Sequence, residues 1–427
     1  MKISLRPLKM LLPFLLVLCL EQVFWEFFID DSDNPLLIRF ELVILCLGFA
    51  TACWYWRRME AAMSGALLLT MGYLLVLMLE SYAMHGTWVV YPHVFFKVMV
   101  LFLMYGTYGY YLRRGLPPLK PLVAVLFVVM FLNLAFIHPE ALSIQGFLDT
   151  ERGFSSSSAL MLVLPTLLCL NWYLQRGRGL PLLMFFAGLG LIIFLQHRSV
   201  WMTMLLALAV NLLLLWRRVP EVRFVPRRVV VLLLLPATVV VMGGLATVLD
   251  NPEVLKKFEA SYEDITKADT QGTGSWRFKQ MRAYEPLVAE RPLLGWRLAG
   301  FEVPMQFYDP TSDAPMWPDG TGHHFHSFYL DRLFYFGWGG LLLVLVPLFM
   351  QIIKRLTHPE PLTVEIAALI SLVVGCLAFG LSYDWPNYLY ALLGLVLVAT
   401  AQPGPVPAVP EPVPDINAES VYQVVSY

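Results

Sequence analysis

The chain has 427 residues, of which 58% are hydrophobic and only 14% are charged. A soluble domain of this length carries about 25% charged residues, so the composition excludes a soluble enzyme and predicts one integral membrane unit. The formal net charge of −1 gives no reason to expect a nucleic-acid partner. All five cysteines fall inside apolar stretches, which favours small buried hydrophobic residues over disulfides or metal ligands.

The apolar stretches, taken in chain order, are long enough to cross a bilayer as helices. We expect spans at 9–29, 36–56, 61–82, 92–112, 119–138, 156–175, 180–196, 199–216, 229–249, 326–353, 362–382 and 386–402. The first follows a basic start without a small-residue cleavage site, so we expect it to be retained as a helix. Only Gln196 to Ser199 separates the seventh and eighth spans, and a tight hairpin is expected there because the unbroken stretch is too long for one crossing.

The predicted fold class is therefore an all-α polytopic membrane protein with about 12 transmembrane helices. A single transmembrane domain is expected over 1–402, with one long loop at 250–325. Repeated Pro-Val and Pro-Glu pairs predict a flexible cytoplasmic tail at 403–427.

The basic residues predict the orientation of these spans. With the N-terminus in the cytoplasm, the inner segments hold 17 of the 30 Lys and Arg, whereas the short outer loops hold only Arg152 and Arg198. Both termini are then cytoplasmic, and His358 is the only one of the eight histidines on the inner side. Charges in or near the spans also lie in the outer half, which predicts a polar cavity that opens outward. Lys97 and Arg332 belong to this set and are expected to contact substrate.

Arg198 lies in the predicted hairpin turn. One interpretation is an interfacial anchor whose side chain reaches the lipid headgroups. The other is a fixed guanidinium that binds a phosphate through two hydrogen bonds.

The long loop contains a segment, 272–282, that could bind an anion. Ser275 is expected to cap a helix with Arg277 in its first turn, so that free amides, the helix dipole and a guanidinium converge. A solvated amphipathic helix with ordinary surface arginines is the competing interpretation. Arg282, Arg291 and Arg297 are weaker candidates of the same kind.

Three histidines, His323, His324 and His326, end the loop. Zinc binding with Asp313 or Asp319 is one interpretation, but neighbouring histidines cannot easily share one metal. A polar interfacial cluster without chemistry is a second. The third is a general base, for which His326 is the choice because it is expected to open the tenth helix, with Leu330 and Leu333 on the same face.

An acidic cluster, Asp30-Asp31-Ser32-Asp33, follows the first span. Carboxylates of this kind can hold a divalent ion against a diphosphate. Outer loops also tolerate acidic residues freely, and this plain interpretation is preferred.

Together these residues resemble the O-antigen ligase/polymerase superfamily of bacterial inner-membrane proteins. The resemblance covers roughly 150–350 and rests on the order of its motifs, listed here: Arg198-Ser199, Arg277, Arg291-Pro292-Leu293-Leu294-Gly295, His326-Ser327-Phe328-Tyr329-Leu330 and Gly337-Trp338-Gly339-Gly340. Two departures affect the subfamily: Trp296-Arg297 follows Gly295 where a Gly-x-Gly is usual, and Ser327 replaces the commoner asparagine.

The resemblance implies a fold like that of membrane-embedded GT-C glycosyltransferases. It also implies transfer of a glycan from undecaprenyl diphosphate to a sugar hydroxyl of lipid A–core, at the periplasmic face of the inner membrane. His326 would be the general base, and Arg198 and Arg277 would neutralise the diphosphate without a metal or other cofactor, with inversion at the anomeric carbon. The arginines Arg282, Arg291 and Arg297, with His323 and His324, would help to bind substrate. The single dominant outer loop favours a ligase.

Three alternatives remain open. A Wzy-type polymerase would use a second lipid-linked glycan as acceptor, and a protein O-oligosaccharyltransferase would use a serine or threonine. A lipid-linked glycan flippase belongs to another class, and the absence of detectable repeats and of midplane charges argues against it.

Overall fold

The computed structural model describes residues 6–32, 34–149, 152–239, 252–266, 272–304, 323 and 325–401. Every regular element within them is helical. The elements are α1 (Arg6–Leu18), α2 (Gln22–Trp25), α3 (Pro35–Tyr55), η1 (Trp56–Arg58), α4 (Ala61–His85), α5 (Pro92–Met99), α6 (Leu101–Tyr111), α7 (Leu119–Phe136), η2 (Pro139–Leu142), α8 (Ile144–Asp149), α9 (Ser156–Leu160), α10 (Val163–Arg176), α11 (Gly179–Phe194), α12 (Arg198–Arg218), α13 (Pro226–Val239), α15 (Pro252–Thr266), α16 (Gly272–Glu290), α17 (Ala299–Glu302), α18 (Phe328–Thr357), α19 (Val364–Phe379) and α20 (Asn387–Thr400).

The structure is that of a polytopic membrane protein. Over the described ranges, seven helical segments are long and apolar enough to cross a membrane, and four shorter apolar helices accompany them. The longer segments are Pro35–Arg58, Ala61–His85, Pro92–Tyr111, Leu119–Phe136, Ser156–Arg176, Arg198–Arg218 and Phe328–Thr357, and the shorter helices are Lys9–Leu18, Gly179–Phe194, Val364–Phe379 and Asn387–Thr400. The predicted tail, 403–427, lies outside the described residues.

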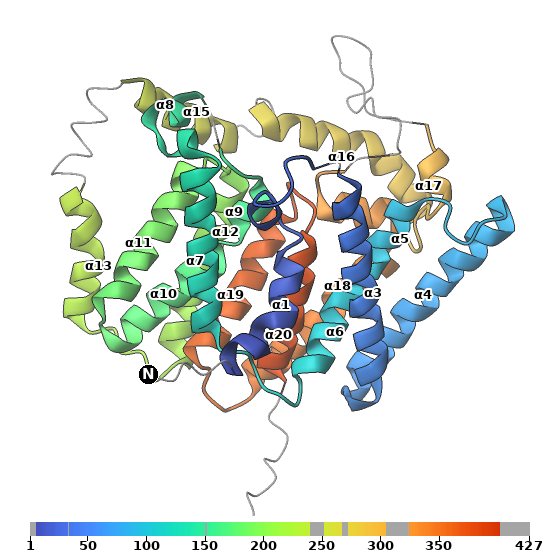
Figure 1. Cartoon of the computed structure of the whole chain (residues 1–427), viewed down its shortest axis with the longest axis horizontal. Helices are drawn as coiled ribbons and strands as arrows, with labels where there is room; N and C mark the ends of the chain where they lie inside the picture. Colours follow the sequence, from blue (N-terminus) through green and yellow to red (C-terminus); the bar gives the residue numbers. More distant parts are fainter. Residues whose placement is uncertain are drawn as a thin grey trace, which may run out of the picture.

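The helices form a bundle that is covered at one end (Figure 1). Helices α8, α15, α16 and α17 gather at this end, which we name the loop face. Helix α1 begins and α20 ends at the opposite side. Helix α16 lies across the ends of the bundle helices rather than along them. Residues from α16 can therefore reach the ends of several bundle helices.

The first predicted span, 9–29, is wrong in its outer part. Helix α1 ends at Leu18, and the short α2 follows after a turn. Glu21 in this turn is only 7% exposed, and its carboxylate accepts a hydrogen bond from the Ser158 hydroxyl at 3.3 Å. A buried carboxylate needs such a partner, which a straight helix would not supply.

The centre of the bundle is built from α10, α19 and α20, whose side chains are almost all buried. A pair of buried amides joins the helices: Asn171 and Asn211 donate to each other at 3.0 and 2.7 Å, and Asn171 also donates to the Val364 carbonyl at 2.8 Å. Interhelical hydrogen bonds of this kind help helices to associate in a bilayer, where burial of apolar surface provides little drive. They fix α10, α12 and α19 relative to one another.

Two glycine motifs of the sequence form one backbone-locked unit at the loop face. The turn Pro292–Arg297 makes four main-chain hydrogen bonds with α18: Trp296 N to Phe334 O, Arg297 N to Tyr335 O, Trp338 N to Pro292 O and Gly339 N to Leu293 O, all 2.8–2.9 Å. Gly337 interrupts α18 with φ 60° and ψ −161°, a conformation that only glycine adopts readily. The interruption frees the carbonyls of Phe334 and Tyr335 to accept hydrogen bonds from the turn. The long loop is thereby fastened to the helix that follows His326.

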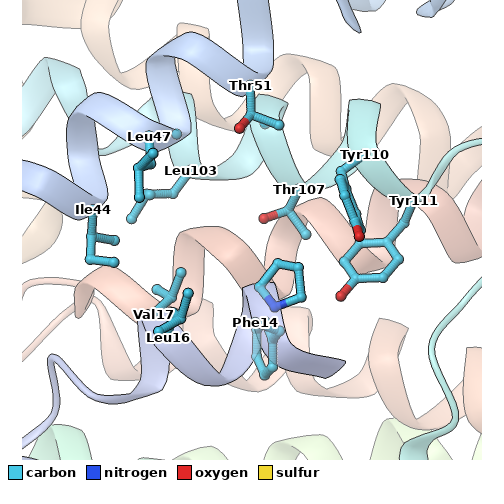
Figure 2. A pocket seen from close by; sticks show the side chains of 13 residues that line it. Phe14, Leu16, Val17, Ile44, Leu47, Thr51, Leu103, Thr107, Tyr110 and Tyr111 are labelled. Carbon is cyan, nitrogen blue, oxygen red and sulfur yellow. The ribbon is translucent and has the colours of Figure 1, made fainter. Parts of the chain in front are cut away.

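An apolar slot opens between α1 and α3 and is closed at its back by α6 (Figure 2). Its volume is about 230 Å³, and its lining carries no charged side chain. Thr51, Tyr110 and Tyr111 mark its end away from the loop face. The slot is thus separate from the polar side chains at the loop face.

Candidate active site

His326 lies just before α18, not on it. The helix begins at Phe328, and the Ser327 side chain caps it by accepting a hydrogen bond from Leu330 N at 3.4 Å. The expectation that His326 opens the helix and shares a face with Leu330 and Leu333 was therefore wrong, because serine is the better N-cap. His326 instead precedes the cap.

The residues around His326 are tied to the turn between α19 and α20. The Ser327 hydroxyl donates to Gly380 O at 3.1 Å. The Phe328 amide lies 3.0 Å from Gly380 O and 3.2 Å from Tyr383 O. The Phe328 ring stacks on Trp385 with centroids 4.1 Å apart. This turn therefore fixes the backbone that carries His326.

Arg277 approaches the same turn from the loop. It lies on α16, which begins at Gly272, so the prediction that Ser275 caps this helix was wrong. Glycine near a helix start costs only about 1 kcal/mol, which tertiary packing readily overrides. Arg277 is consequently in the second turn of α16 rather than the first.

Tyr383 is the common neighbour of His326 and Arg277. The guanidinium carbon of Arg277 lies 4.8 Å from the centre of the Tyr383 ring, a cation–π distance. The His326 ring meets the same ring at 6.1 Å and 63°, an edge-on arrangement. Two of the three residues that the sequence proposed for catalysis thus lie against one side chain.

Arg198 is the first residue of α12 and lies at the same level along the bundle as the turn between α19 and α20. Helices α12 and α19 run antiparallel, since Leu362 N donates to Arg218 O at 2.8 Å at one end. Further along, a Cβ on Gly375 would lie 2.8 Å from Thr203 O. Continuing this pairing toward the loop face brings Arg198 level with Gly380. Arg198 is therefore level with the turn that Arg277 and His326 approach.

Other basic groups surround the start of α12. Burial, and then the charges of Arg152 and Arg198, lower the pKa of Lys257, while Asp149 offsets part of the effect. His197 is 6% exposed, with Nε2 2.9 Å from the Phe154 carbonyl. Burial lowers the pKa of His197 to about 4, so this imidazole is neutral at physiological pH. The charges of Arg152, Arg198 and Lys257 make the region at the start of α12 cationic.

Lys97 and Arg332, predicted to contact substrate, belong to a buried ionic network. Lys97 Nζ lies 2.5 Å from Asp331 Oδ1, and Asp331 is fully buried. Arg332 donates to Lys97 O and to the Tyr390 hydroxyl, both at 2.8 Å, and lies 3.9 Å from Asp384 Oδ1. This network joins α5, α18 and α20.

Asp384 is the exposed end of that network. Its side chain is 35% exposed, whereas Arg332 is 3% exposed. Burial raises the pKa of Asp384, and the Arg332 charge opposes this shift. Asp384 therefore places a carboxyl group beside Tyr383 at the loop face.

The remaining predicted residues are distributed along the loop. Arg297 pairs with Glu80 at 2.7 Å, Arg291 lies 4.0 Å over the Trp296 ring, and Arg282 is exposed. His323 Nε2 donates to the Val303 carbonyl at 2.8 Å, so Nδ1 must accept from the Tyr284 hydroxyl at 2.6 Å. Burial lowers the pKa of His323, and protein atoms already occupy both of its nitrogens.

Several residues of the metal interpretations lie outside the described residues, namely His324, Asp313, Asp319 and Asp33. Asp30 and Asp31 are exposed. Within the part of the chain that the structure describes, no three His, Cys, Asp or Glu side chains lie together as metal ligands would.

The sequence did not point to Tyr383 or Asp384. One signal was present: Asp384 is the only charged residue between the last two predicted spans, and an aromatic residue precedes it. A charged residue in so short an outer loop is a better candidate for the active site than one in a long loop, because the short loop holds it close to the membrane surface.

Comparison with known protein families gives one match: residues 182–345 fit the model described as O-antigen ligase. A comparison with curated proteins gives no match. The matched segment runs from α11 into α18 and contains Arg198, Arg277 and His326. Members of this family are ligases and polymerases that transfer glycans. The structure is thus that of a multi-pass membrane protein, and its residues 182–345 are similar to the O-antigen ligase family.

Proposed function

We propose that this protein is an O-antigen ligase, which transfers a glycan from undecaprenyl diphosphate to a sugar hydroxyl of lipid A–core. The observation that carries the proposal is the meeting of Arg277 and His326 on Tyr383, with Arg198 at the same height. A candidate base and two guanidinium groups are the side chains that such a transfer requires. They come from α16, the start of α12 and the segment just before α18, and all lie in the segment that matches the family.

His326 acts as the general base in this proposal. A sugar hydroxyl is a poor nucleophile until its proton is removed, and an imidazole can accept that proton near neutral pH. The acceptor oxygen then attacks the anomeric carbon as the bond from that carbon to the diphosphate breaks. Attack from the side opposite the leaving group inverts the anomeric centre.

Arg198 and Arg277 stabilise the leaving group. Undecaprenyl diphosphate gains negative charge as it departs, and fixed guanidinium groups neutralise phosphate charge through paired hydrogen bonds. The charges of Arg152 and Lys257 add to the positive potential near Arg198. The mechanism assigns this role to arginines and needs no metal ion.

The loop face is the periplasmic face of the inner membrane in this proposal. The excess of Lys and Arg on the opposite side supports this orientation. The start of α1 and the end of α20 also lie on that opposite side. Both lipid-linked substrates then reach the site from the outer leaflet, and both chain termini are cytoplasmic. Twelve crossings satisfy this arrangement.

The test is reconstitution of the full chain with a lipid-linked glycan and rough lipopolysaccharide, followed by analysis of the products. Transfer to the lipopolysaccharide is expected, and His326→Ala should abolish it. Extension of one lipid-linked glycan by another would instead identify a polymerase. Transfer to a serine or threonine of a protein would identify an oligosaccharyltransferase. Full activity of His326→Ala would overturn the mechanism, and loss of activity on chelation would overturn the metal-independent assignment.

A further inference from the structure

Tyr383 is held rigidly in the turn between α19 and α20. Its amide donates to Phe379 O at 3.0 Å, and its carbonyl lies 3.2 Å from the Phe328 amide. Its ring stacks on the Phe379 ring, with centroids 5.2 Å apart and 24° between the planes. The ring is thus anchored to α19 by main chain and side chain together.

The Arg277 guanidinium lies over the same ring. Its guanidinium carbon lies 4.8 Å from the ring centre, while Phe379 stacks on the ring at 5.2 Å. Arg277 belongs to α16, which lies across the bundle (Figure 1). Tyr383 is therefore a point at which the loop helix meets the membrane bundle.

His326 takes the edge of the same ring. It lies outside α18, so the helix hydrogen-bond ladder does not fix its position. The ring contact at 6.1 Å and the main-chain bonds of Phe328 to the turn help to hold this segment. The same turn thus sets the positions of the imidazole and the guanidinium.

We propose that Tyr383 is a positioning residue, whose ring sets the distance between Arg277 and His326 in the glycan transfer proposed above. Phe379 and Arg277 already lie against the ring, so we assign Tyr383 a positioning role and not that of a stacking platform for a sugar. The aromatic ring performs this role, and the hydroxyl is dispensable. Because misplacement of a reacting group by about 1 Å can reduce a rate roughly 100-fold, loss of the ring should lower kcat.

The experiment compares Tyr383→Phe and Tyr383→Leu in the reconstituted full chain, with lipid-linked glycan as donor and rough lipopolysaccharide as acceptor. Tyr383→Phe keeps the ring and should retain kcat within about twofold, since phenylalanine also binds cations by its face. Tyr383→Leu should reduce kcat by about 10- to 100-fold. Tyr388→Leu is the matched control: Tyr388 is a buried tyrosine nearby, and its hydroxyl donates to Ser157 O at 2.9 Å. Tyr388→Leu should lower the Tm at least as much as Tyr383→Leu does, but it should leave kcat near the wild-type value.

A double variant tests whether Tyr383 acts through Arg277. If the ring acts only by setting the distance between Arg277 and His326, Tyr383→Leu combined with Arg277→Met should have a kcat close to that of Arg277→Met alone, because no guanidinium remains whose distance from His326 the ring could set. Additive losses would overturn the proposal, as would wild-type kcat in Tyr383→Leu. Equal losses in Tyr383→Phe and Tyr383→Leu would also overturn it, because the hydroxyl would then be the active part. Inactive His326→Ala beside active Tyr383→Leu would refute only the role of Tyr383, whereas active His326→Ala would refute the proposed function.

Discussion

Replacing Gly337 by alanine should separate α18 from the turn Pro292–Arg297. The φ and ψ of Gly337 lie in a region used almost only by glycine, where another residue costs about 1–3 kcal/mol. A Cβ at this position would also lie 2.5 Å from Pro292 O and from the Leu293 carbonyl carbon. Both are main-chain atoms, which cannot move without disturbing the four hydrogen bonds of the turn.

The expected loss follows from these two terms. Backbone strain alone gives about 2 kcal/mol, and loss of the four bonds at about 1 kcal/mol each brings the total to roughly 6 kcal/mol. Thermal unfolding of the purified protein in detergent measures the loss as a lower Tm. Gly65→Ala is the matched control, because open space surrounds its Cβ position and a helical glycine gains about 1 kcal/mol from alanine. Equal Tm values for Gly337→Ala and wild type would refute this reasoning.

Three further predictions concern side chains near the site. Lys97→Met should destabilise the protein by about 3–5 kcal/mol in thermal unfolding, since it leaves the buried Asp331 carboxylate without its 2.5 Å partner. The double variant Lys97→Met with Asp331→Asn should recover part of this loss. No recovery would contradict the conclusion that Lys97 stabilises the protein by pairing with Asp331. Ser327→Asn should keep both stability and activity because asparagine caps helices as well as serine does, whereas Ser327→Ala should lose about 1 kcal/mol in the same assay. The pKa of His197 falls from 6.5 to about 4 on folding, so the unfolded chain binds a proton at a higher pH than the folded chain does. The free energy of unfolding should therefore drop by about 3 kcal/mol as the pH falls from about 6.5 to 4. His197→Gln should remove that part of the pH dependence of Tm, and an unchanged slope would argue against it.

Much of the fold could be predicted from apolar length alone. The predicted spans at 36–56, 180–196 and 362–382 coincide with helices to within a few residues, because a bilayer demands long apolar helices. The failures occurred where polar residues and tertiary contacts decide. The buried Glu21 lies where α1 ends early, and α16 begins three residues before the cap expected at Ser275.

The motifs of the candidate site could be found in the sequence, but their geometry could not. The order of Arg198, Arg277 and His326 was sufficient to suggest a shared site. The contact of two of them with Tyr383 joins positions far apart in the chain, so no local pattern reports it. The pairing of the turn Pro292–Arg297 with the interruption at Gly337 is of the same kind, because hydrogen bonds between two separate motifs leave no periodic signal.

The most direct test of the proposed site measures donor binding and glycan transfer on the same set of variants in lipid nanodiscs. His326→Ala should bind lipid-linked glycan diphosphate as tightly as wild type and transfer none of it, since the imidazole acts on the acceptor proton. Arg198→Met and Arg277→Met should each weaken binding of the diphosphate donor. If His326→Ala transferred glycan at the wild-type rate, or if neither arginine variant changed donor binding or transfer, these three residues would not form the active site.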